Sequence, residues 1–166
     1  MDLSQLANLG EAIGGFAVIG SVIFLAYELR ASTKILKASK AAESSEQWAS
    51  FNQITMQNTD VIGIVQKAFV EKRPLADFSM EESIRFDAYC RAVMQLAESE
   101  YFLYEAGIHP GDVYGNRITN LRSWMNLPAW NDWWNREKSV SMYSSDFINN
   151  LFPAGSILPE DSKSTS

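Results

Sequence analysis

The 166-residue sequence predicts an all-α protein in which an N-terminal transmembrane helix continues into a small cytoplasmic helical bundle. No charged residue lies between Ala12 and Tyr27. The later apolar residues recur at helical spacing, and no segment of useful length alternates with the period of a strand. Together with the helix start and stop signals, these patterns divide the chain into an anchor at 1–30, a bundle at 31–152 and a disordered tail at 153–166.

The uncharged segment predicts a helix without a polar face. The consecutive apolar residues from Val22 to Tyr27 point in every direction around a helix axis. The 16 residues extend roughly 24 Å, so flanking residues such as Leu9 and Leu29 are needed to cover the ~30 Å hydrocarbon core. A buried central helix of a soluble bundle is the alternative. A cleaved signal peptide is less favoured, because no basic residue precedes the segment.

The first cations of the chain follow this segment directly. They are Arg30, Lys34, Lys37 and Lys40, with no acid between Leu29 and Ala42. The positive-inside bias therefore predicts that the N-terminus lies outside and that residues 30–166 lie in the cytoplasm. The same cations are candidate contacts for anionic lipid headgroups, at about 1 kcal/mol each.

Small residues line one face of the predicted anchor. Gly10, Gly14, Ala17 and Ser21 recur at helical spacing, and the first two form a GxxxG pair. Such a face lets a second helix approach closely, which makes it a candidate site for homo-oligomerisation or for a protein partner. The alternative is that small residues are simply common in membrane helices.

Helical signals continue after the anchor. Because residues 31–58 contain neither Gly nor Pro, we expect the first helix to continue as one rod or to bend near Ser32 and Thr33. Asn58, Thr59 and Asp60 offer N-cap side chains for a second helix that stops before Pro74.

The clearest start signal is the capping box Ser79-Met-Glu-Glu82. The helix that it opens is expected to end at Gly107, with Pro110 just beyond. This helix is apolar over most of its circumference, which is typical of the central member of a bundle. Its polar edge is formed by Asp87, Arg91, Gln95, Glu98 and Glu105.

Three shorter helices complete the predicted bundle. Asp112 is expected to cap the first of them. Asn126 and Pro128 are expected to provide the N-cap region and the first turn of the second. Ser144 or Ser145 is expected to start the last.

Composition excludes several classes of function. The formal net charge of −6 argues against a nucleic-acid partner, because binding there depends on neutralising phosphates. The one cysteine, Cys90, rules out an internal disulfide framework. With one histidine, His109, the chain cannot assemble a usual zinc, haem or iron–sulfur ligand set. We therefore expect no cofactor and no metal, and the sequence contains no recognisable catalytic motif.

Four blocks of the sequence resemble a widespread family of small bacterial proteins. The blocks are LANLGEAIGGFAVIGSVIFLAYELRAST, NTDVIGIVQKAF, ESEYFLYEAGI and LPAWNDWW, and they span most of residues 6–137. The resemblance implies one N-terminal transmembrane helix with a cytoplasmic helical domain, and it implies no activity. Glu98 and Tyr101 match an E-x-x-aromatic pattern of that family, whereas Glu105-Ala106 departs from it, because a basic residue is usual there.

Four charged residues form a candidate internal polar site: Glu98, Glu100, Arg117 and Arg122. On a helical wheel Glu100 lies among apolar residues, so we expect it to be neutral or paired with Arg117 or Arg122. A ligand-facing acid is the less favoured alternative. For Glu98 we expect a solvated helix face near Arg91.

Four of the five tryptophans lie close together and form a candidate aromatic pocket: Trp124, Trp130, Trp133 and Trp134. Such a cluster binds an apolar ligand or a partner helix, although more often it is simply core. Because Trp133 and Trp134 are adjacent, we expect one of them to be exposed.

Together with the resemblance, the sequence as a whole favours a single-pass protein of the bacterial inner membrane with a non-catalytic interaction or accessory role. A small-ligand-binding or sensory helical domain is the alternative. An enzyme that uses Glu98 or Glu100 as an acid–base group is the least favoured class.

The anchor makes a testable prediction. A reporter that is active only in the cytoplasm should be active when fused after Ser166, and the protein should resist carbonate extraction from membranes. Recovery of the protein in the soluble fraction would contradict the anchor and favour a core helix.

Overall fold

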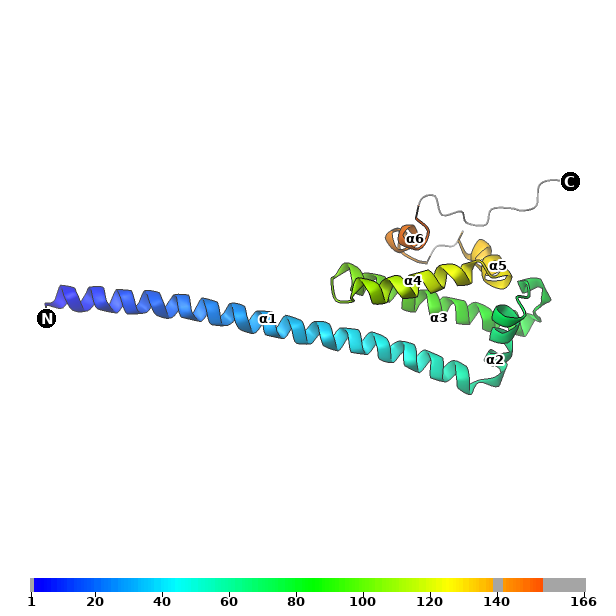
Figure 1. The fold of residues 1–166 in the computed structure, drawn as a ribbon, viewed down its shortest axis with the longest axis horizontal. Coiled ribbons are helices and arrows are strands. Elements are labelled where there is room, and N and C mark those ends of the chain that lie inside the picture. Colours follow the sequence, from blue (N-terminus) through cyan, green and yellow to red (C-terminus); the bar gives the residue numbers. More distant parts are fainter. Residues whose placement is uncertain (1, 139–141, 154–166) are drawn as a thin grey trace. The chain divides into compact units, whose positions relative to one another are not determined.

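The computed structural model describes residues 2–138 and 142–153, apart from the side chains of residues 3–10 and 12 (Figure 1). All regular structure in this part of the chain is helical, which confirms the predicted class. The elements are α1 (Leu3–Gln57), α2 (Thr59–Val65), a π-helical turn η1 (Gln66–Val70), a 3-10 turn η2 (Leu75–Asp77), α3 (Met80–Glu105), α4 (Gly111–Met125), α5 (Pro128–Glu137) and α6 (Ser145–Leu151).

The chain divides into two compact units, residues 1–40 and residues 41–166. Helix α1 contributes to both, because it is unbroken through Ser32 and Thr33, where the sequence also allowed a bend. Most of the predicted tail, residues 154–166, lies outside the described residues.

In the first unit most of the described side chains of α1 are exposed. Every side chain from Ile13 to Arg30 is exposed, including Phe16 at 77%. Among the described residues, α1 is the one helix long and apolar enough to cross a membrane, by length and composition. The hydroxyl of Ser21 donates to the carbonyl of Ala17 (2.8 Å), and that of Thr33 donates to the carbonyl of Leu29 (2.7 Å). These polar groups are therefore satisfied within the helix.

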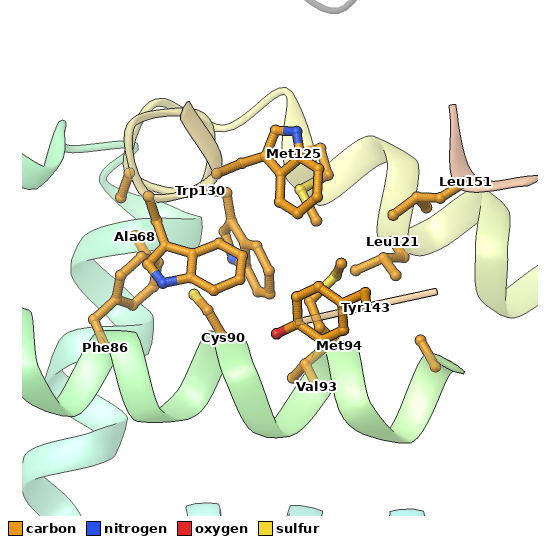
Figure 2. Packing of buried hydrophobic residues seen from close by; sticks show 14 of the residues in the cluster. Ala68, Phe86, Cys90, Val93, Met94, Leu121, Met125, Trp130, Tyr143 and Leu151 are labelled. Atoms are coloured by element: carbon orange, nitrogen blue, oxygen red, sulfur yellow. The ribbon is translucent and has the colours of Figure 1, made fainter. Parts of the chain in front are cut away.

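The second unit is built around α3. Its buried side chains include Phe86, Cys90, Val93 and Met94, and they face residues of α4 and α5 such as Trp130 (Figure 2). Helix α2 and the turn η1 contribute Ile64 and Ala68 to the same core. A helix covered from several sides needs apolar residues over most of its circumference, as the sequence of α3 shows.

Local capping signals define several helix ends as predicted. The Ser79 side chain accepts the Glu82 N–H (3.2 Å), and the Glu82 carboxylate accepts the Ser79 N–H (2.8 Å), which completes the capping box. Helix α3 ends before Gly107, whose φ of 64° lies in the left-handed region that glycine adopts without strain. Asn58 and Ser144 are the N-caps of α2 and α6.

Two predicted caps are wrong. Asp112 is not an N-cap, because α4 begins at Gly111 with Pro110 in the N-cap position, which places Asp112 in the first turn. Asn126 instead ends α4, and Leu127 occupies the N-cap position of α5 because Pro128 is the first helical residue.

The expectation that one of two adjacent tryptophans is exposed is also wrong. Trp133 is fully buried and Trp134 is only 5% exposed. The reason is that α5 is covered on two sides: Trp133 packs toward α3, and the ring of Phe152, which follows α6, lies 5.3 Å from the ring of Trp134.

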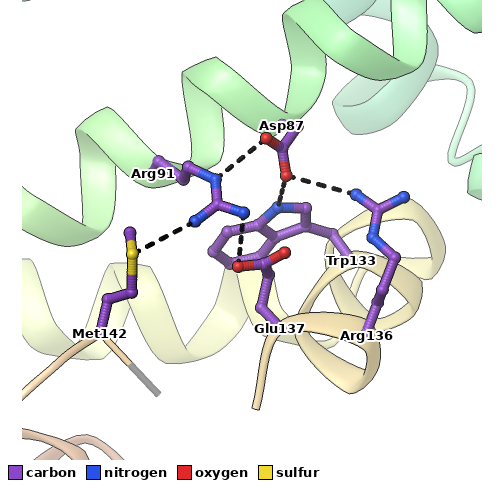
Figure 3. A network of polar contacts seen from close by, with 6 residues as sticks. All are labelled: Asp87, Arg91, Trp133, Arg136, Glu137 and Met142. Atoms are coloured by element: carbon purple, nitrogen blue, oxygen red, sulfur yellow. Dashed lines mark hydrogen bonds and ion pairs between the residues drawn. The ribbon is translucent and has the colours of Figure 1, made fainter. Parts of the chain in front are cut away.

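A polar network at the edge of the core fastens α5 to α3 (Figure 3). Asp87 accepts hydrogen bonds from the Arg91 Nε (2.9 Å), the Trp133 indole (2.9 Å) and the Arg136 guanidinium (3.3 Å). Arg91 also pairs with Glu137 of α5 at 2.7 Å. Burial raises the pKa of Asp87, but the bonds from Arg91 and Trp133 outweigh it and hold that pKa below its usual value.

Replacing Asp87 tests this network. At pH 7 we expect Asp87→Asn to lower the free energy of unfolding by about 1–3 kcal/mol, because hydrogen bonds to a charged acceptor are lost. Because the pKa of Asp87 is lowered in the folded state, its contribution is present above the unfolded pKa and is lost as the pH falls below about 4.

The free energies of unfolding of Asp87→Asn and of the unmodified protein should therefore become more similar at acidic pH. Urea unfolding followed by circular dichroism at several pH values measures it. The exposed Asp77→Asn is the control, with an expected change below about 0.5 kcal/mol. A difference for Asp87→Asn that is independent of pH would contradict the role of the ionised carboxylate.

Candidate functional site

A cavity of about 360 Å³ lies between α1, α3 and α4 within the second unit. This volume falls at the small end of the ~300–1,000 Å³ typical of ligand pockets. The lining is formed by Trp48 and Asn52 of α1, by Val93, Ala97 and Glu100 of α3, and by Tyr114, Arg117, Ile118, Asn120, Leu121 and Trp124 of α4. The cavity therefore combines an apolar interior and two indole rings with a few polar groups.

Glu100 is the buried acid of this pocket. Its side chain forms an ion pair with Arg117 of α4, and its Oε1 accepts a hydrogen bond from the hydroxyl of Ser44 of α1 at 2.9 Å. Glu100 is 2% exposed, so these contacts replace the water that the carboxylate loses on folding. One carboxylate of α3 thereby connects the two helices that form the other walls.

Arg117 is held from two sides. Its guanidinium pairs with Glu100 and lies over the ring of Trp48, 5.6 Å from the ring centroid, in a cation–π arrangement. Burial lowers the pKa of Arg117, but an arginine side chain keeps its charge in proteins at neutral pH. The pair places one positive and one negative charge side by side, so the net charge of the lining is zero.

Glu98 and Arg122 lie outside this pocket and hold α6 instead. The Glu98 carboxylate accepts the backbone N–H of Ser144 at 2.6 Å, at the start of that helix. Arg122 donates to the carbonyls of Leu151 (2.8 Å) and Asn150 (2.6 Å) at its end. The solvated surface expected around Glu98 is not found, because the approach to α6 half-buries it and Arg91 turns toward Asp87 and Glu137.

The four clustered tryptophans lie in one run of ring contacts: Trp124–Trp130, Trp130–Trp133 and Trp133–Trp134, with ring centroids 6.0, 5.7 and 6.2 Å apart. They do not all face the pocket. Trp124 lines the pocket, whereas Trp130, Trp133 and Trp134 belong to the buried core. The second tryptophan of the pocket is Trp48, which the sequence did not single out. A signal for it exists: Ser44, Trp48 and Asn52 are four residues apart, so they share one face of a helix that is otherwise mostly polar there.

Two other reactive residue types lie away from the pocket. Cys90 is fully buried, and burial raises the pKa of its thiol well above the usual value, which suppresses thiolate chemistry. His109 is buried in the connection between α3 and α4. Within the described residues, no group of three or more His, Cys, Asp and Glu side chains is placed to hold a metal ion.

The candidate residues of the first unit keep their predicted positions along α1. At Gly14 an added Cβ would meet nothing within 4 Å, so this part of the small-residue face is open. The surroundings of Gly10 lie outside what the structure describes. Of the four cations, Arg30, Lys34 and Lys37 are exposed and Lys40 is half-buried.

Replacing Glu100 and replacing Arg117 should lower the free energy of unfolding by different amounts. Glu100→Gln keeps a shape that can accept the Ser44 hydrogen bond, so we expect a loss of about 1 kcal/mol or less. Arg117→Met leaves the Glu100 carboxylate buried and unpaired, which typically costs about 3–5 kcal/mol.

Urea unfolding of the full chain in mild detergent measures both changes. Arg85→Met, at an arginine paired with Asp60 and Glu81, is the control and should cost less than about 1 kcal/mol. Equal and small losses for Glu100→Gln and Arg117→Met would show that the carboxylate is solvated.

No protein-family model, no curated protein and no solved structure matches this chain. What the protein does must therefore be inferred from its own pocket and helices.

Proposed function

We propose that the protein is a single-pass membrane protein whose helical bundle binds a small, largely apolar ligand. The pocket between α1, α3 and α4 carries this proposal, because it combines an apolar interior with the converging polar side chains of Asn52, Glu100 and Arg117. Such a cavity is the usual form of a small-molecule site. The sequence alone favours partner docking, but docking does not require an internal cavity, so ligand binding is the better-supported function.

Three features of α1 support membrane anchoring. The apolar side chains from Ile13 to Leu29 are uncovered, whereas a core helix of a soluble protein would have them buried. The hydroxyl of Ser21, within the apolar segment, is satisfied by the carbonyl of Ala17 of its own helix, as a lipid environment requires. The cations that begin at Arg30 follow the apolar segment, which favours an external N-terminus and a cytoplasmic bundle. The resemblance to single-anchor bacterial proteins supports the same arrangement.

The two indole rings and the aliphatic side chains supply most of the binding free energy in this proposal. Covering apolar surface contributes roughly 25 cal/mol per Å² removed from water. Trp48 and Trp124 offer large flat surfaces that cost little conformational entropy when a ligand covers them. The amides of Asn52 and Asn120 are exposed and can orient a polar group of the ligand.

A neutral aromatic probe tests whether the pocket binds ligands. N-phenyl-1-naphthylamine should raise the Tm of the full chain in mild detergent, because a ligand that binds only the folded state stabilises it by about 2.7 kcal/mol at 100 times its Kd. This free energy corresponds to a rise of roughly 5–10 °C. Thermal unfolding followed by circular dichroism gives the shift.

A matched pair of variants locates the effect. Asn120→Trp places a bulky ring on the lining and should abolish the probe-dependent rise in Tm. Asn116→Trp makes the same substitution four residues earlier on α4, outside the lining, and should keep the rise. If the unmodified protein shows no rise, or if both variants keep it, the pocket does not bind the probe and the proposed function is wrong.

A further inference from the structure

We infer that the pocket selects uncharged ligands: lipophilic molecules that carry a hydroxyl, carbonyl or amide group but no net charge. This inference rests on the ligand-binding function proposed above. It follows from the charges of the lining, from the position of its neutral polar groups and from its size.

The charge balance of the lining disfavours ions. Among its residues only Glu100 and Arg117 are charged, and they pair with each other. An anionic ligand that approached Arg117 would leave the buried Glu100 carboxylate without its cation. A cationic ligand that approached Glu100 would displace Arg117 in the same way. Because a buried charge without a partner is unfavourable, either ion would gain one contact by destroying another.

The neutral polar groups of the lining favour a neutral polar group on the ligand. Asn52 and Asn120 are exposed, and each amide offers both a hydrogen-bond donor and an acceptor. Apart from the paired Glu100, the buried part of the lining is mostly apolar and includes Val93, Ile118 and Leu121. A ligand with an apolar body and one neutral hydrogen-bonding end therefore matches both regions.

The size of the cavity limits the ligand further. About 360 Å³ admits a small ring system or a short branched chain, whereas a complete two-chain lipid is far larger. Small neutral lipophiles concentrate in bilayers because burial of apolar surface drives them there. The proposed anchor would keep the protein at the bilayer, where such ligands are concentrated.

Two probes with the same skeleton test the selection. N-phenyl-1-naphthylamine is neutral, and 1-anilinonaphthalene-8-sulfonate is the same molecule with an added sulfonate. Each is titrated into the full chain in a non-ionic detergent, and the signal of the Asn120→Trp variant is subtracted to isolate binding in the pocket. We expect the neutral probe to bind the unmodified protein at least tenfold more tightly than the sulfonate.

The Glu100→Gln variant should largely remove this preference for the neutral probe. With its carboxylate replaced by an amide, Arg117 becomes available to an anion. We expect the affinity for the sulfonate to rise at least tenfold, while the affinity for the neutral probe changes less than threefold. Arg117→Gln leaves the negative charge in place and should bind the sulfonate no better than the unmodified protein does.

The outcomes separate this inference from the proposed function. Absence of pocket-specific binding of the neutral probe overturns the proposed function, and the inference with it. Equal pocket-specific binding of both probes by the unmodified protein overturns only the charge selection. A folded Glu100→Gln variant that gains no affinity for the sulfonate also overturns the selection mechanism. If that variant does not fold, the ratio of the two probe affinities measured on the unmodified protein still tests the charge selection.

Discussion

The second unit depends on how α3 satisfies the carboxylates that it carries into the bundle. Three of them each bind a different part of the structure to this central helix. Asp87 accepts bonds from Trp133 and Arg136 of α5, and Glu98 accepts the N–H that precedes α6. Glu100 binds α1 and α4 together. An acid inside a bundle is costly unless it is paired, so each acid favours the arrangement in which its partner is present.

These polar contacts specify which element packs where, while apolar burial supplies most of the stability. A buried ion pair is often no more stabilising than well-packed apolar residues, but it is strongly unfavourable when one partner is missing. Because apolar burial is non-directional, it allows a short helix such as α6 several orientations. The Glu98 and Arg122 contacts at the two ends of α6 restrict that helix to one of them.

Local signals in the sequence were sufficient for the central helix and for several helix ends. The capping box at Ser79 and the stop at Gly107 depend only on neighbouring residues. The two wrong caps have a local cause as well: Pro110 and Pro128 fix where α4 and α5 begin, and the flanking Asp112 and Asn126 do not compete with them.

The errors at the candidate site have a tertiary cause. Trp134 is covered by Phe152, which lies beyond another helix, so no local pattern could reveal its burial. The helical wheel predicts that Glu100 lies inside the bundle, but it leaves both Arg117 and Arg122 of α4 as possible partners. Only the packing of α6 shows that Arg122 instead donates hydrogen bonds to the carbonyls at the end of that helix. The sequence does not single out Trp48, because this residue lies in a largely polar part of α1 and lines a cavity only together with residues of α3 and α4.

The pocket persists because α1 is held to α3 at two separated points. Near one end Ser44 binds Glu100, and near the other Phe51 packs against Tyr89 with ring centroids 5.4 Å apart. Between these points Trp48 contacts the guanidinium of Arg117 on α4. The indole of Trp48 lines the cavity at this position.

A ligand in this cavity would touch α1, α3 and α4 at once. Its binding free energy would therefore favour the packed arrangement of residues 41–57 over arrangements in which this part of α1 separates from the bundle. The hydrogen bond from Ser44 to Glu100 acts in the same direction without a ligand, because separating α1 removes this hydroxyl from the buried carboxylate. The proposed ligand selection and the packing of α1 thus involve the same carboxylate.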